Sequence, residues 1–171
     1  AVVGLSVMYR DQVEPALAAS IVARKLWPDV LIVWGGAHVS ALRDEIANER
    51  RYACAALIDA FVFGYAERTW VDLLDAVARR TQPPTEAVKA GSGVWRTAFD
   101  DGAVTPLFDD LSSFEPGRLT LPSQCSRGCS YGQCLFCTYP AIEGRWRVLP
   151  IEPIRAVVHD AVRRGAAISF K

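Results

Sequence analysis

The chain has 171 residues, 51% of them hydrophobic, and its formal net charge at pH 7 is zero. This length allows one full hydrophobic core and part of a second. The neutral charge gives no electrostatic reason to expect binding to nucleic acid or to an anionic membrane. No apolar run reaches the roughly 18 residues of a membrane-spanning helix. The opening Ala1-Val2-Val3 predicts a strand without a basic leader, so no signal peptide is expected.

The first 80 residues alternate between short apolar runs and segments with helical periodicity. Strands are predicted at residues 2–8, 30–34 and 58–63, and the segments between and after them predict helices at 11–27, 41–52 and 67–80. This alternation predicts an α/β fold with a parallel, doubly wound sheet.

Residues 81–118 predict a linker between two domains. They contain clusters of proline and of glycine, which favour loops. Two short apolar runs at 94–99 and 103–107 flank an Asp-Gly turn and predict a small hairpin within the linker. The first domain thus covers residues 1–80, and the second covers residues 119–171.

The second domain is expected to contain a strand, a cysteine-rich loop, a helix at about 153–164 and a strand at 167–171. A parallel strand needs a crossover and a neighbouring strand. Because the chain opens with one apolar strand and stops within another, we expect it to be a fragment of a longer protein. On this view, the beginning of the first domain and the remainder of the second are absent.

Four of the five cysteines lie between residues 125 and 137, and thiolates are natural ligands for zinc and for iron–sulfur clusters. A zinc site would use all four thiols, although zinc ligands usually come in two separated pairs. A three-thiolate cluster would leave one iron open for a substrate or cofactor. A disulfide would suit a secreted protein, whereas clustered thiols without a leader favour a reducing cytoplasm. Spacing alone leaves zinc and the cluster about equally open.

Arg127-Gly128-Cys129 and the later Cys-x-Phe-Cys, directly after the apolar run at 119–122, resemble the first strand and cluster loop of radical S-adenosylmethionine (SAM) enzymes. The resemblance implies that a [4Fe–4S] cluster is bound by Cys129, Cys134 and Cys137. It also implies that Phe136 lies near bound SAM and that Cys125 is a spare thiol outside the motif. The first spacing has one residue more than the family's usual three, as in variants with a longer loop. Arg145-Trp146-Arg147 is either a solvated strand edge or the source of an arginine that helps position the cluster loop.

Three predicted strand ends carry small or polar residues: Ser6, then Gly35-Gly36, then Gly64-x-x-Glu. Ligands of open parallel sheets lie beyond the carboxyl ends of the strands. In this order the segments resemble the cobalamin-binding domain found upstream of many radical SAM domains. The resemblance implies that Ser6 faces the lower side of the cobalamin and that Gly35 and Gly36 make room for its nucleotide tail. The family's earlier loop, which in some members supplies a histidine to cobalt, would precede Ala1.

Together the two resemblances imply a Rossmann-like (flavodoxin-like) cobalamin-binding domain followed by the beginning of a radical SAM (β/α) partial barrel. The expected function is a cobalamin-dependent radical SAM methyltransferase that acts on an unactivated carbon of a natural product or peptide. Its partners would be that substrate and a one-electron reductant such as flavodoxin or ferredoxin, with no nucleic acid and no membrane. One alternative uses the same cofactors for rearrangement, cyclisation or epimerisation. The alternative of another class is a zinc-stabilised binding domain without enzymatic activity. The sequence assigns no catalytic residue.

Overall fold

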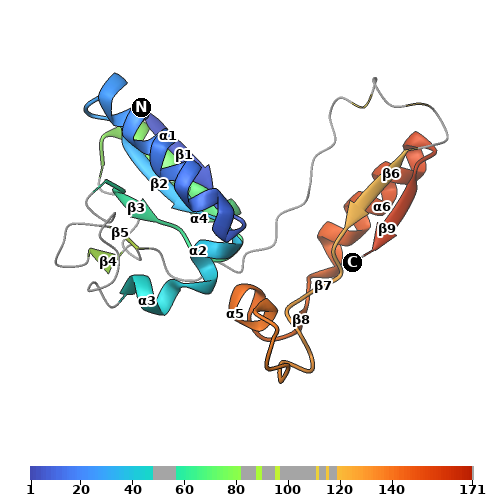
Figure 1. Cartoon of the computed structure of the whole chain (residues 1–171). Coiled ribbons are helices and arrows are strands. Elements are labelled where there is room, and N and C mark those ends of the chain that lie inside the picture. Colours follow the sequence, from blue (N-terminus) through green and yellow to red (C-terminus); the bar gives the residue numbers. More distant parts are fainter. Residues whose placement is uncertain are drawn as a thin grey trace. The chain divides into compact units, whose positions relative to one another are not determined.

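The computed structural model describes residues 1–47, 57–81, 88–89, 95–96, 111, 115 and 119–170. The chain divides into two compact units, Ala1–Gly102 and Ala103–Lys171, and each is considered by itself. Both units combine helices with parallel strands (Figure 1), which confirms the predicted α/β class.

The first unit is built on a five-stranded sheet with the strand order β1-β2-β3-β5-β4. Its strands are β1 (Val2–Ser6), β2 (Leu31–Gly35), β3 (Ala60–Phe61), β4 (Val88–Lys89) and β5 (Trp95–Arg96). The first four in spatial order run parallel, and β4 pairs antiparallel with β5. The three strands predicted in this unit are therefore confirmed: β1 and β3 are shorter than expected, and β2 has the expected length but begins one residue later.

Strands β4 and β5 belong to the segment that the sequence assigns to a linker. Because β5 pairs with β3, the sheet of the first unit continues at least to Arg96. The predicted hairpin between 94–99 and 103–107 falls outside the described residues, except for the two residues of β5.

The helices of the first unit follow its strands. They are α1 (Val13–Leu26), preceded by the 3₁₀ turn η1 (Arg10–Gln12), then α2 (Ala37–Ala41), α3 (Arg43–Ala47) and α4 (Glu67–Arg79). The helices predicted at 11–27 and 67–80 are confirmed. The one predicted at 41–52 begins earlier, directly after Gly36, and is interrupted at Leu42. Residues 48–56 are outside the described part of the chain.

Helices cover both faces of this sheet. Successive residues of a strand point to opposite faces, so neighbouring residues of β2 pack against different helices. Ile32 and Trp34 of β2 pack in one core cluster with residues of α1, whereas Val33 packs in a second cluster with Leu73 of α4. Trp34 is only 1% exposed, and its indole Nε1 donates a 3.0 Å hydrogen bond to Ser20 Oγ on α1. A strand covered on both faces must be apolar throughout, which explains the continuous apolar run that predicted it.

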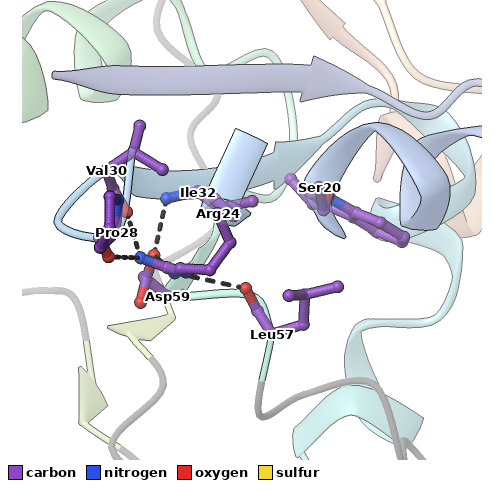
Figure 2. Close-up of polar contacts among 8 residues, drawn as sticks. Ser20, Arg24, Pro28, Val30, Ile32, Leu57 and Asp59 are labelled. Atoms are coloured by element: carbon purple, nitrogen blue, oxygen red, sulfur yellow. Dashed lines mark hydrogen bonds and ion pairs between the residues drawn. The ribbon is translucent and has the colours of Figure 1, made fainter. Parts of the chain in front are cut away.

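A polar network fixes the end of α1 to the beginnings of β2 and β3 (Figure 2). The Arg24 guanidinium donates to the backbone oxygens of Pro28, Val30 and Leu57 and to the carboxylate of Asp59. The same carboxylate accepts a 2.7 Å hydrogen bond from the Ile32 amide. These contacts lie at the amino edge of the parallel strands, so we assign them to stability and look for ligand sites at the opposite edge.

The second unit contains a strand–helix–strand motif. Strand β6 (Thr120–Ser123) pairs in parallel with β9 (Ala167–Phe170), and α6 (Ile151–Arg164) lies between them in sequence. Leu121 of β6 and Val157 of α6 are buried. The predicted cap, Gly165, ends α6 in the left-handed conformation with φ +63°.

Shorter elements stand between β6 and α6. They are β7 (Ser126–Arg127), α5 (Tyr139–Glu143) and β8 (Arg147–Val148), with β7 and β8 paired antiparallel. Within the described part of both units, no helix combines the length and the apolar character needed to cross a membrane.

Candidate functional site

The cysteine loop, defined here as residues 125–137, follows β6 almost directly. It therefore starts at the carboxyl end of the parallel pair β6–β9, before the chain returns through α6. Sites of parallel α/β proteins lie at this end of their strands, because the strand-to-helix connections meet there. The position of the loop thus suits a ligand site.

Backbone pairing holds the first part of the cysteine loop. Arg127 in β7 pairs with Arg147 in β8, and Leu149 donates a 3.0 Å backbone hydrogen bond to Cys125. Cys129 forms an isolated bridge with Arg145. The segment from Arg145 to Leu149, which includes β8, therefore positions the loop through its backbone.

Gly128 allows this close approach. Its φ is +82°, and a Cβ at this position would lie 2.3 Å from the carbonyl oxygen of Arg145. A side chain here would have to displace backbone, since both the conformation and the space require glycine. The glycine of the Arg-Gly-Cys motif is thus explained by packing within the chain.

None of the four cysteines of the loop forms a disulfide, and all are half-buried except for the exposed Cys137. The Gly132 amide donates a hydrogen bond to Cys129 Sγ at 3.3 Å, and the Cys137 amide donates to the Cys134 carbonyl oxygen, also at 3.3 Å. Hydrogen bonds from the backbone to sulfur are one of the means by which proteins tune iron–sulfur ligands. Among the thiols of the loop, that of Cys129 therefore already accepts such a bond.

No group of three or more His, Cys, Asp or Glu side chains within 1–47, 57–81 and 119–170 is placed to hold a single metal ion. A four-iron cluster makes a different demand, because each cysteine thiolate binds its own iron. The ligands of a cluster need not converge on one point. By the chemistry of its donors, the cysteine loop fits such a cluster.

Two apolar side chains stand exposed between the last two cysteines. Phe136 is 91% exposed and Leu135 is fully exposed, so neither contributes to the core of the unit. Apolar surface of this kind gains free energy when a ligand or another surface covers it. The exposed ring of Phe136 is compatible with the predicted SAM contact, which stays a prediction.

In the first unit, Ser6 and Gly35 are register partners at the carboxyl ends of β1 and β2. Ser6 is exposed, and a Cβ at Gly35 would lie 3.3 Å from the carbonyl oxygen of Val62, the residue that follows β3. Two of the residues predicted to contact cobalamin therefore lie side by side at the edge where ligands of such sheets bind.

Gly36 has an explanation within the chain itself. Its φ is +99°, and a Cβ would lie 2.6 Å from the carbonyl oxygen of Val7. That oxygen accepts a 3.1 Å hydrogen bond from the His38 amide at the start of α2. The glycine is required by this turn whether or not a ligand binds, so its presence does not itself indicate a nucleotide tail.

Ser40 connects the strand ends and was not found from the sequence. It is only 1% exposed; its hydroxyl donates to the Gly36 carbonyl oxygen and accepts from the Gly64 amide, both at 2.9 Å. The Val7 amide donates to the Gly35 carbonyl oxygen at 2.7 Å, which joins the first strand end to the second. The only signal for Ser40 was its place four residues after Gly36, where a helical serine can bond back to the preceding turn.

No protein-family model matches the chain, and no curated protein matches it.

Proposed function

We propose that the protein is a cobalamin-dependent radical SAM enzyme that methylates an unactivated carbon of a natural product or peptide. Its first unit would be a Rossmann-like cobalamin-binding domain, and its second the beginning of a radical SAM partial barrel. The observation that carries the proposal is a loop with four cysteines, none of them in a disulfide, at the carboxyl end of a parallel strand–helix–strand motif.

Residues of the second unit have separate tasks in this proposal. Cys129, Cys134 and Cys137 would hold the cluster, and Phe136 would contact SAM beside it. Gly128 and the β7–β8 pairing keep Cys129 at a constant position relative to β6. A constant first ligand is useful because small displacements of reacting groups cost large factors in rate.

The first unit would hold cobalamin at its strand ends. Ser6 and Gly35 present little side-chain bulk there, and Ser40 keeps the loops that follow β2 and β3 together. When bound, the cluster would supply the electron that cleaves SAM reductively, and cobalamin would supply the methyl group. The protein's own contribution is to position the reactants and to exclude water.

Metal and cofactor analysis of the full-length protein, purified without oxygen, tests the proposal. We expect about four iron atoms per chain, as for one [4Fe–4S] cluster, together with bound cobalamin in the visible spectrum. Zinc without iron would replace the proposal by the zinc-stabilised binding domain. Iron without any affinity for cobalamin would remove the methyl-transfer part.

A further inference from the structure

Arg145 is the residue that the fold brings directly beside the first cysteine of the motif. Its backbone forms a bridge with Cys129. Gly128 lets the two segments approach so closely that a Cβ there would also lie 2.7 Å from the Trp146 amide nitrogen. The long side chain of Arg145 therefore starts from a backbone position that is paired with that of Cys129.

Arg145 and Arg147, which lie two residues apart at the start of β8, differ in what their side chains contact. Arg147 donates from Nη1 to the backbone oxygens of Glu143 at 3.3 Å and of Arg145 at 3.4 Å. Arg145 is exposed, and its guanidinium makes no hydrogen bond or ion pair with any residue that the structure describes. Its charge is thus available to a ligand of the cysteine loop, whereas Arg147 is engaged with the backbone.

We propose that Arg145 is an electrostatic positioning residue of the cysteine loop, which holds a positive charge beside Cys129 and favours the reduced state of the bound cluster. This inference rests on the proposed function. Thiolate ligands make the bound cluster anionic, and an added electron increases its negative charge. A neighbouring guanidinium stabilises the more negative state, so it raises the reduction potential.

The size of the effect follows from exposure. Because the guanidinium is in contact with water, its attraction to the added electron is strongly screened. We expect loss of the charge to lower the ratio of reduced to oxidised protein about threefold at a fixed applied potential. For a one-electron couple, tenfold corresponds to 59 mV, so threefold is about 30 mV toward more negative potential. High salt should shrink this difference.

The test is a redox titration of the full-length protein after anaerobic reconstitution, followed by electron paramagnetic resonance. A reduced mediator dye gives one electron to the cluster and is itself oxidised by one electron, without making or breaking a bond. The variants are R145Q, which removes the charge, and R145K, which keeps it. R155Q is the matched control, because Arg155 is an exposed arginine of α6 and its loss changes the net charge equally.

The inference predicts a more negative potential for R145Q and a potential near that of the unaltered protein for R145K and R155Q. Equal shifts in R145Q and R155Q, or no shift in R145Q, would overturn it. If R145Q takes up less iron, R145K decides: restored iron and potential support a role of the charge, and equal loss in both variants contradicts it. Absence of iron in the unaltered protein would instead refute the proposed function, on which the inference depends.

Discussion

At the scale of single residues, the same geometry recurs at both candidate sites. Gly36 and Gly128 have positive φ, and in each case a Cβ would collide with the backbone of a segment distant in sequence. These glycines let two loops cross closely, and each lies beside residues predicted to bind a cofactor. Their first task is therefore structural, whatever the sites bind.

Replacement of Gly36 by alanine should destabilise the first unit. The backbone would have to leave φ +99° or push the Val7 carbonyl aside, and strained positions of this kind cost about 1–3 kcal/mol. Urea-induced unfolding measures the change. Gly35→Ala is the control, because Gly35 has no positive φ and its nearest backbone atom lies farther away, at 3.3 Å. Equal losses of stability in the two variants would contradict this account.

The assignment of the cysteines leads to a second prediction. Alanine at Cys129, Cys134 or Cys137 should abolish the brown chromophore and the iron content of reconstituted protein, because each removes one ligand. Cys125→Ala should retain both, although Cys125 lies in the same loop and, like the other three, forms no disulfide. Loss of iron in Cys125→Ala, with iron kept in one of the other variants, would show that the ligand set is wrong.

Ser6 offers a cleaner test of cobalamin binding than Gly36. It is exposed at the end of β1, so leucine at this position fits the fold and protrudes where the ligand is expected. We expect Ser6→Leu to weaken cobalamin binding about tenfold or more, through loss of contact worth roughly 1.4 kcal/mol. A spectroscopic titration measures it. Ala18→Leu, on the exposed side of α1, adds similar bulk elsewhere and should bind normally; unchanged affinity in Ser6→Leu would exclude Ser6 from the site.

At the scale of elements, α4 has unusual ends. Ala66 before it and Arg80 after it are the two non-glycine residues with positive φ in the described chain, at +62° and +55°. A helix that ends in this left-handed conformation usually has glycine at the position of Arg80, since glycine carries no Cβ penalty. The arginine therefore stores strain that a substitution can release.

Arg80→Gly should raise the free energy of unfolding by about 0.5–1 kcal/mol, the relief of strain less the greater freedom of glycine in the unfolded chain. Arg79→Gly, one residue earlier and still helical, should lower it by up to about 1 kcal/mol. Chemical denaturation of both variants gives the two signs. If both variants change the free energy of unfolding in the same direction, the left-handed conformation of Arg80 does not explain the effect.

The elements that the sequence predicts well are those whose signal is local. The apolar run of β2 and the periodicity of α1 and α4 are visible in the chain itself, and the structure confirms them. Strands β4 and β5 have two residues each, too short for any periodicity, and only their pairing with β3 makes them strands. The start of α2 was missed because Gly35-Gly36 favours a turn.

The features of the candidate sites likewise fall into those with a local sequence signal and those that depend on tertiary contacts. Cysteine spacing is local, so the loop and its thiols could be found from the sequence. The bridge from Cys129 to Arg145 and the hydrogen bond from the Gly64 amide to Ser40 depend on tertiary contacts between segments far apart in the chain. Neither leaves a pattern in the residues themselves.

At the scale of the whole molecule, the reaction that we expect follows from the pairing of the two proposed cofactor sites. A methyltransferase of this kind should use one SAM as methyl donor and another as radical source for each product. We therefore expect S-adenosylhomocysteine and 5′-deoxyadenosine in comparable amounts in a turnover assay with the true substrate. Formation of 5′-deoxyadenosine alone, with a product of unchanged mass, would favour rearrangement, cyclisation or epimerisation.

The close backbone contact of Gly128 with Arg145 and Trp146 has a consequence for the length of the cysteine loop. Cys129 forms a backbone bridge with Arg145, whereas the four residues that follow Cys129 are exposed. An additional residue inserted there can bulge into water without displacing the first thiol, and lengthening a flexible loop by one residue costs little closure entropy. Insertions are thus expected to be tolerated after Cys129, within residues 130–133, and not before it. The spacing between Cys129 and Cys134 can therefore vary, while the backbone position of Cys129 stays the same.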